Sequence, residues 1–155
     1  MVAAGLAQPA CAIALSPLTD GLLMGGTIQR NGGIDPMFTA RGFRAIAPLY
    51  IADPAQRAVP LASPLYSDCV GLARLLLMAG SSELLLGDSV RFALRCPGAE
   101  LQVWHDMPHV FPLFDFLPEA APALEELARF IVRHDAVRVE PAQAEPGPGT
   151  SEDVP

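Results

Sequence analysis

Lysine is absent from this 155-residue sequence, and all ten of its basic residues are arginines. Seventeen acidic residues outnumber them, so the formal net charge is -7 at pH 7. Binding to phosphate backbones needs a basic stripe, and without one we expect no nucleic-acid partner. Long apolar runs are also missing. Although 51% of the residues are hydrophobic, no stretch approaches the roughly 18 uninterrupted apolar residues of a transmembrane helix, and we expect no membrane span.

The first nine positions contain no basic residue. An apolar N-terminus without Lys or Arg ahead of it lacks the charged start of a secretory signal, which predicts a cytoplasmic protein.

Cysteines are few. Cys11, Cys69 and Cys96 lie far apart, and no C-x-x-C pair is present to hold a metal or to run redox exchange. We expect buried free thiols, and neither a metal nor a cofactor.

Short apolar runs bounded by Pro and Gly are what the sequence does contain. Such runs have the length of strands that are buried on both faces of a parallel sheet. The second and third runs are separated by a helix-compatible segment, and the order strand, helix, strand is that of a βαβ unit. The three predicted strands and the intervening helix cover residues 9–16, 73–79, 101–104 and 84–94.

Two further helices are predicted around this unit. One begins at Thr39, which is suited to the N-cap, and extends to Tyr50 with a break or bend near Pro48. The other covers residues 118–134 and places its acidic residues opposite one apolar face. That face is expected to contain Ala121, Leu124, Leu127, Ala128 and Ile131.

The length fits one domain followed by a tail. A chain of 155 residues is long enough to bury a single core. Within the domain, a glycine-rich loop over residues 17–36 is long enough to indicate a functional or mobile segment. Residues 139–155 are rich in Pro, Gly and acidic residues and have no apolar periodicity. We therefore predict a domain over residues 1–138 and a disordered tail over residues 139–155.

Candidate chemical groups follow the second and third predicted strands. Glu83 comes shortly after the strand 73–79, and His109 follows the strand 101–104. Open parallel sheets carry their functional groups beyond the carboxyl ends of the strands. If these strands are neighbours about 5 Å apart, the Glu83 carboxylate can reach a ring nitrogen of His109 and orient it as a general base. The alternative is structural: His109 caps a loop, and Glu83 begins a helix.

Five segments of the chain carry a family resemblance: 16–20 (SPLTD), 35–36 (DP), 60–66 (PLASPLY), 80–86 (GSSELLL) and 104–111 (WHDMPHVF). In this order, the sequence resembles the hormone-sensitive-lipase-like branch of the α/β-hydrolases over about residues 3–134. Members of that branch are serine esterases that act on short acyl esters and related lactones. Each segment alone is moderately specific, whereas five in register are a strong signal.

The resemblance implies an α/β fold in which this chain forms the C-terminal half of an α/β-hydrolase, with about three parallel strands and flanking helices. Residues 1–138 are then a partial α/β-hydrolase domain. Glu83 stands where the family keeps the acid of its catalytic triad, and His109 stands where it keeps the base. The chain order, acid before histidine, is the one that this fold uses. A small acyl ester or lactone is the implied substrate of the completed enzyme.

The sequence also departs from the family pattern. Leu18 replaces a common Trp, while Ser82 and Gly87 replace two common Asp residues. The helix that follows Asp88 is several residues short. We expect these changes to shift the loop that carries the acid.

The triad nucleophile has no counterpart in these residues. No G-x-S-x-G elbow and no HGGG-type oxyanion segment occurs, and Asn31-Gly32-Gly33 matches neither motif. Four serines are not credible substitutes, because none of them lies on a strand-to-helix elbow that faces His109: Ser16, Ser63, Ser81 and Ser82. By resemblance, the N-terminal half with the nucleophile and the oxyanion loop is missing. We expect the chain alone to be inactive, because triad members act as a unit.

Three hypotheses follow from this absence. The chain is the C-terminal part of an esterase from a split, truncated or misassigned reading frame; or a separate N-terminal chain completes it in trans; or it is a non-catalytic binding module. In the first two hypotheses, the apolar strand 9–16 has an open edge where the strand of the missing half would pair. The third predicts ligand binding that is indifferent to His109→Ala.

Overall fold

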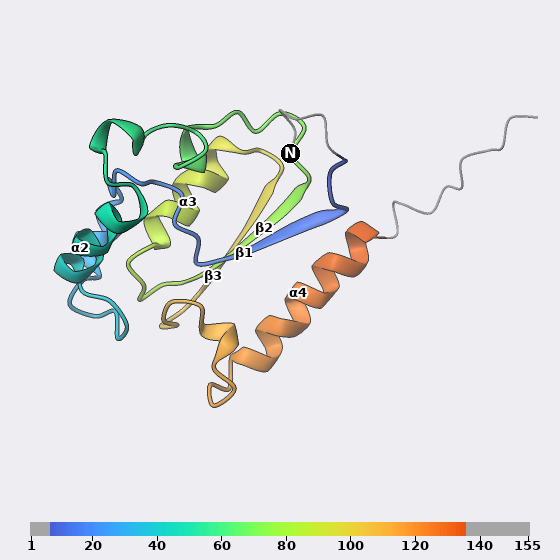
Figure 1. The fold of residues 1–155 in the computed structure, drawn as a ribbon. Coiled ribbons are helices and arrows are strands. Elements are labelled where there is room, and N and C mark those ends of the chain that lie inside the picture. The colour runs from blue at the N-terminus through green and yellow to red at the C-terminus, as the bar shows by residue number, and fades with distance from the viewer. Residues whose placement is uncertain (1–6, 136–155) are drawn as a thin grey trace, which may run out of the picture.

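The computed structural model describes residues 7–135, and its centre is a three-stranded parallel sheet (Figure 1). The strands β1 (Cys11–Leu15), β2 (Arg74–Gly80) and β3 (Ala99–Trp104) are hydrogen-bonded in the order β1-β2-β3. In the register of the sheet, Leu77 pairs with Ala14 on one side and with Leu101 on the other. The three predicted strands and their parallel arrangement are confirmed.

Burial differs between the central strand and its neighbour β1. From Leu76 to Ala79, the residues of β2 are at most 1% exposed, as expected for a strand covered on both faces. Every residue of β1 is only half-buried, because β1 pairs with β2 on one side and has no partner strand on the other among the described residues. The prediction that residues 9–16 are buried on both faces is wrong for this chain by itself.

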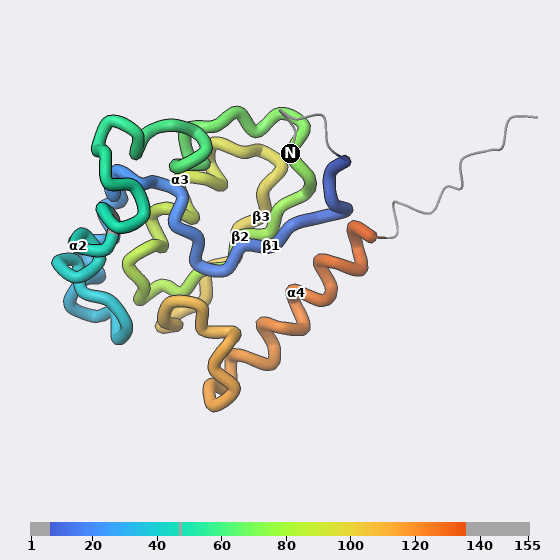
Figure 2. Tube along the Cα trace, viewed as in Figure 1, coloured from blue at the N-terminus to red at the C-terminus, as the bar shows by residue number. Residues whose placement is uncertain are grey.

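Helices cover the two faces of the sheet unequally. The helix α3 (Leu86–Arg95) packs on the face that presents Leu77, and α4 (Ala120–Asp135) packs on the face that presents Met78. Figure 1 shows α3 and α4 on opposite sides of the strands. The segment between β1 and β2 follows the α3 side in the trace of Figure 2. That segment includes the short helix α1 (Gly26–Arg30), which contacts α3 and which the sequence analysis assigned to a loop.

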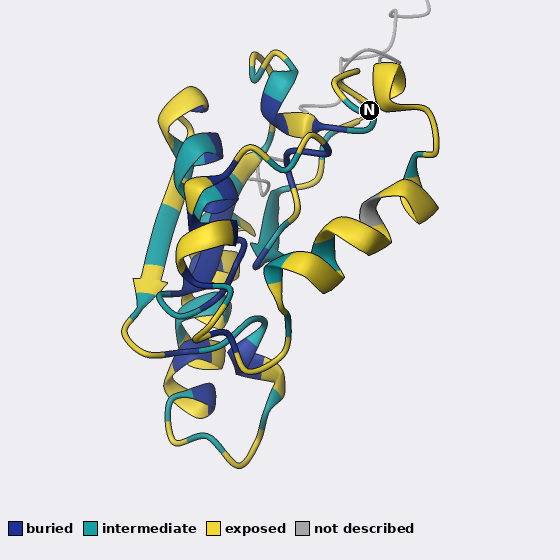
Figure 3. Cartoon of the chain, turned by 90° about the vertical axis from the view of Figure 1, so that its left-hand side faces the viewer, coloured by how far each residue is buried: buried dark blue, intermediate teal, exposed yellow. Residues whose placement is uncertain are grey.

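The helix α2 (Ala40–Tyr50) forms as predicted, and it continues past Pro48 rather than ending there. Its expected apolar face is covered only in part: Ile46 is 51% exposed and Tyr50 is 68% exposed. Figure 3 shows α2 as an arm that is exposed over most of its length. Amphipathic spacing predicted the helix correctly. On its apolar side, Phe43 is half-buried and meets Phe38 edge to face, with ring centroids 5.6 Å apart.

The buried face of α4 also differs from the predicted one. Leu124 is 49% exposed and Ile131 is 46% exposed. The helix turns a neighbouring stripe inward, because Ala123 and Leu127 pack with Met78 and Phe111. Both stripes have helical spacing, so periodicity alone did not separate them. The buried residues of α4 are Ala120, Ala123 and Phe130.

The cysteines are not three free thiols. Cys69 and Cys96 form a disulfide with their Cα atoms 5.5 Å apart, and Cys11 is free and half-buried. Cys69 precedes β2 and Cys96 precedes β3, and parallel strands begin at the same edge of a sheet. The topology therefore brings together two residues that are 27 positions apart in the sequence.

No helix in the part of the chain that the structure describes combines the length and apolarity needed to cross a membrane. Within residues 7–135, the remaining elements are the single-turn 3-10 helices Pro54–Gln56 (η2), Pro64–Tyr66 (η3) and Phe111–Leu113 (η4). The predicted tail, residues 139–155, lies outside the described residues.

Candidate functional site

Two loops meet at the carboxyl edge of the sheet. The loop after β2 carries Glu83, and the loop after β3 carries His109. Their backbones are joined by hydrogen bonds from Ser81 N to the carbonyl of Trp104 and from Ser82 N to that of Met107. At the end of β2, Gly80 permits this approach, because a Cβ there would lie 2.0 Å from the Met107 carbonyl oxygen. The fold therefore brings Glu83 and His109 close together, as the sequence predicted.

The Glu83 carboxyl is completely buried at this edge. Its Oε2 accepts hydrogen bonds from Ser16 Oγ at 2.5 Å and from Gly80 N at 3.3 Å. Its Oε1 has no hydrogen-bond partner among the described residues. Burial raises the pKa of Glu83 to about 7, the charges of Asp35 and Asp88 add to the rise, and the two hydrogen bonds oppose it. Glu83 is therefore close to half-ionised at neutral pH.

His109 faces this carboxyl. Its Nδ1 lies 3.9 Å from Glu83 Oε2, and its side chain is 16% exposed. The ring of Phe38 meets the imidazole edge to face, with centroids 5.1 Å apart. Burial lowers the pKa of His109, while the charge of Asp35 opposes that shift. The imidazole is thus mainly neutral at pH 7, which is the form that accepts a proton.

The Nδ1–Oε2 separation is longer than a hydrogen bond. His109 Nδ1 has no hydrogen-bond partner in residues 7–135, and neither has Glu83 Oε1. The imidazole and the carboxyl that face each other thus each have one buried polar atom without a hydrogen-bond partner among the described residues. A shift of about 1 Å would join the carboxyl to the ring, and catalytic hydrogen bonds are often long before substrate binds.

The glycine-rich segment supports the acid loop, which sequence reasoning did not predict. Asn31 Nδ2 donates to the carbonyls of Ser81 and Glu83, and Leu84 N donates to Asp35 Oδ2 at 2.8 Å. Asp35 belongs to one of the five resemblance segments, so it carried a signal, whereas Asn31 had none. These contacts hold the loop that carries Glu83.

Ser16 is the residue whose role the sequence analysis missed most clearly. Ser16 belongs to the first resemblance segment, but nothing in that segment predicts a contact with the acid, and its hydroxyl donates to Glu83 rather than to His109. No serine within residues 7–135 has a hydrogen bond to His109 among the described contacts. The same described residues contain no group of three or more His, Cys, Asp or Glu side chains that could hold a metal ion.

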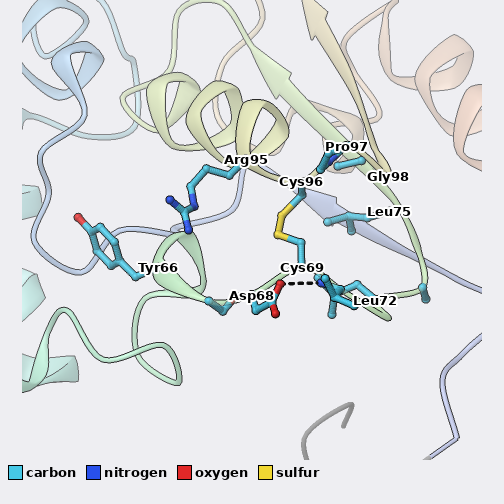
Figure 4. Close-up of a pocket in the computed structure, with 13 residues that line it drawn as sticks. Tyr66, Asp68, Cys69, Leu72, Leu75, Arg95, Cys96, Pro97 and Gly98 are labelled. Atoms are coloured by element: carbon cyan, nitrogen blue, oxygen red, sulfur yellow. Dashed lines mark hydrogen bonds between the residues drawn. A yellow bond between two sulfur atoms is a disulfide. The ribbon is translucent and has the colours of Figure 1, made fainter.

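A pocket of about 580 Å³ lies at the opposite, amino edge of the sheet. The Cys69–Cys96 disulfide forms part of its wall, below the end of α3, and Arg95 extends along it (Figure 4). Leu75 and Ala99, the first paired residues of β2 and β3 in this part of the sheet, line its floor. The pocket therefore does not belong to the Glu83–His109 site.

Comparison with known proteins identifies relatives of the chain. Residues 1–113 match a family described as alpha/beta hydrolase fold. An esterase of Acinetobacter venetianus is 32% identical over 133 residues, which are 83% of this chain and 44% of that protein. The crystal structure of a hormone-sensitive lipase from a metagenome library is 32% identical, with a TM-score of 0.80 over 86% of this chain and 47% of that one.

A third relative is an esterase of the bacterial hormone-sensitive lipase family. Its crystal structure is 35% identical, with a TM-score of 0.81, and the match covers 86% of this chain and 46% of that one. The chain thus spans less than half the length of each of these relatives. At more than 30% identity, the agreement extends to the sequence as well as to the fold.

Proposed function

The chain belongs to the α/β-hydrolase family, in its hormone-sensitive-lipase-like branch, and on that basis we propose that it supplies the acid and the histidine of a serine carboxylic-ester hydrolase. Glu83 is the proposed acid and His109 the proposed base. The observation that carries the proposal is their meeting at the carboxyl edge of the sheet, with Nδ1 facing Oε2 at 3.9 Å. Short acyl esters or lactones are the proposed substrates.

The chemistry assigned to the pair follows from its geometry. An ionised Glu83 accepts a hydrogen bond from the Nδ1–H of His109, which fixes the tautomer and leaves Nε2 free. Neutral His109 then takes the proton of a serine nucleophile, and the imidazolium that forms is stabilised by the buried carboxylate. The serine attacks the ester carbonyl, and an acyl-enzyme forms as the alcohol leaves with the proton. Water then attacks the acyl-enzyme with the same histidine as base, the carboxylic acid leaves, and the histidine returns the proton to the serine oxygen.

The serine and the oxyanion donors are proposed to come from polypeptide beyond these 155 residues, either in the same protein or in a separate chain. No G-x-S-x-G or HGGG segment occurs in the sequence. The half-buried β1 has one free edge among the described elements, and α2 and α4 expose apolar residues such as Tyr50 and Leu124. These are the surfaces that further strands and helices would cover. The 155 residues alone are expected to be inactive.

A cytoplasmic location stays a prediction of the sequence. The Cys69–Cys96 disulfide does not favour it, because disulfides persist in oxidising compartments and are rare in the cytosol.

A chimera tests the proposed function. Its first part is the N-terminal portion of the Acinetobacter venetianus esterase, and this chain replaces the portion that it matches. We expect the chimera to hydrolyse a short-chain p-nitrophenyl ester and to lose that activity on His109→Ala. His105→Ala is the matched control, because this histidine lies in the same loop with a side chain that is 90% exposed.

Two outcomes of this experiment contradict the proposal. One is a folded chimera without activity, and the other is activity that His109→Ala leaves unchanged. Binding of an acyl ester by the chain alone, with equal affinity in the His109→Ala variant, would instead support a non-catalytic binding module.

A further inference from the structure

Resting on the proposed function, we propose that Ser16 is a positioning residue that holds the Glu83 carboxyl and the backbone beyond His109 in one arrangement. Its hydroxyl donates to Glu83 Oε2 at 2.5 Å and accepts from Val110 N at 2.9 Å. Through one side chain, the end of β1 is thereby tied to the loop of the acid and to the loop of the base.

The backbone at both ends of this bridge is strained. Ser16 has φ 48° and Val110 has φ 48°, in the left-handed region that residues other than glycine rarely adopt. A β-branched residue such as Val is especially unfavourable there. The Ser16 backbone is held in place by the hydrogen bond from its N to the Met78 carbonyl at 2.8 Å. Such strain persists where surrounding structure imposes it, and it gathers at functional sites.

Burial strengthens the effect of the Ser16 hydroxyl on the Glu83 carboxyl. Ser16 is 3% exposed and the Glu83 carboxyl is fully buried, so water does not readily replace the serine as a donor. Apart from Ser16, Gly80 N is the hydrogen-bond donor to the Glu83 carboxyl in the described residues, at the longer distance of 3.3 Å. The serine is therefore the main group that stabilises the carboxylate at this site.

The charges around Glu83 make such a donor necessary. Asp35 and Asp88 both disfavour its ionised form, and no Arg forms an ion pair with it in residues 7–135. His109 is the facing base, and the Glu83 carboxyl stabilises its imidazolium when the carboxyl is ionised. Ser16 favours the ionised form of the Glu83 carboxyl and holds its Oε2 in place. Through Glu83, it thereby influences the orientation and the charge of His109.

The test is a carboxyl NMR titration of the 155-residue chain, which needs no nucleophile and no activity. The chain is labelled with 13C at glutamate, and the Glu83 resonance is the one lost in Glu83→Gln. A hydrogen bond to a charged group is worth about one pKa unit or more, so Ser16→Ala is expected to raise the titration midpoint of Glu83 by about one unit. Ser16→Gly is expected to do the same while relieving the strained φ, which separates the hydroxyl from the backbone.

Ser81→Ala is the matched control. The Ser81 hydroxyl accepts from Asp106 N at 2.8 Å, so it also bridges a strand end to the His109 loop, but it does not contact Glu83 in the described hydrogen bonds. Its removal should leave the Glu83 midpoint unchanged. A Glu83 midpoint that stays at the wild-type value in folded Ser16→Ala and Ser16→Gly would overturn the proposal.

A measurement on the unmodified chain covers the case in which both variants fail to fold. Because the Ser16 hydroxyl joins Glu83 to Val110 N, the amide shift of Val110 should show a titration step at the Glu83 midpoint. That step should vanish in Glu83→Gln, and a Val110 amide without it would count against the bridge.

In an active chimera, Ser16→Gly should lower kcat near neutral pH with KM unchanged, and higher pH should restore kcat as Glu83 ionises. An inactive chimera contradicts the esterase but leaves the titration result standing, so the two failures are distinguishable.

Discussion

The two edges of the sheet are held together by different means. At the amino edge, a disulfide joins the segments that precede β2 and β3, beside a pocket of about 580 Å³. At the carboxyl edge, the loops are joined by hydrogen bonds around the buried Glu83. One edge relies on a covalent link, and the other on polar groups that are costly to bury.

Backbone strain follows the same division. The non-glycine residues with positive φ in residues 7–135 are Ser16, Leu23, Asp106 and Val110, and all of them lie in loops that follow β1 or β3. In the turn directly before β2, the residue with positive φ is Gly71, which has no Cβ to clash in that conformation. The carboxyl edge thus carries both strain and a carboxyl with a raised pKa. This is the expected pattern when one edge is built for chemistry and the other for stability.

The largest expected effect is on catalysis at the carboxyl edge. In the chimera, Glu83→Ala should lower kcat by roughly 10³- to 10⁴-fold, because the histidine loses its orienting carboxylate. Steady-state hydrolysis of a short-chain p-nitrophenyl ester measures this. Asp106→Asn, an exposed acid in the neighbouring loop, serves as control and should leave kcat within a factor of about two. Equal losses in both variants would remove the distinction between Glu83 and its surroundings.

The next effect concerns the covalent link at the amino edge. The disulfide closes a loop of 27 residues, and replacing both of its cysteines by Ser should lower the free energy of unfolding by about 3.5 kcal/mol. Urea unfolding under non-reducing conditions measures the difference. Cys11→Ser removes the free thiol and controls for the change of side chain. An equal stability of wild type and double variant would show that the amino edge does not depend on the bond.

Adding one methyl group should distinguish the two edges directly. Gly80→Ala would place a Cβ 2.0 Å from the Met107 carbonyl oxygen, so the loops must separate, at a cost of about 3 kcal/mol or more. Gly98→Ala, in the turn before β3, meets nothing within 4 Å and should change stability by less than about 0.5 kcal/mol. Thermal unfolding of the two variants compares them. Similar losses in both would mean that the close approach at Gly80 carries no special constraint.

The smallest of these effects is a pH dependence of stability. The pKa of Glu83 is raised from 4.5 to about 7 in the folded chain. The folded state therefore binds its proton more tightly, and the stabilisation is present below pH 4.5 and lost as the pH rises through 7. Between pH 5.5 and 7, the loss should be roughly 2 kcal/mol.

Glu83→Gln isolates this contribution, because it removes the titrating carboxyl and retains the shape of the side chain. His109 has the opposite influence: its pKa is lowered, so its contribution is present above 6.5 and lost as the pH falls. Comparing wild type and Glu83→Gln at each pH cancels that background. A difference that does not change between pH 5.5 and 7 would contradict the raised pKa of Glu83.

Local patterns predicted the strands, the main helices and the pairing of Glu83 with His109. β2 was predictable because the apolar run over residues 73–79 has the length of a strand and lies between Gly71 and Gly80. The pairing followed from the rule that neighbouring parallel strands end at the same edge. The roles of these two residues in catalysis stay a proposal.

Other features had no local signal. The disulfide depends on two turns that meet only in the folded sheet, and the buried face of α4 depends on Met78 and Phe111 beneath it. The bridge by Ser16 joins positions 94 residues apart. The short helix α1 was missed because glycines surround it, and its side chains gain their contacts from α3.

By itself, the sequence determined the family, the parallel βαβ unit, the acid and histidine candidates and the lack of a nucleophile motif. Each of these depends on residue type and order along the chain. Only the tertiary structure decided which oxygen of Glu83 is held, by which hydroxyl, at what distance from His109, and how far burial moves both pKa values. Those properties depend on desolvation and on contacts between distant segments, and neither exists until the sheet has formed.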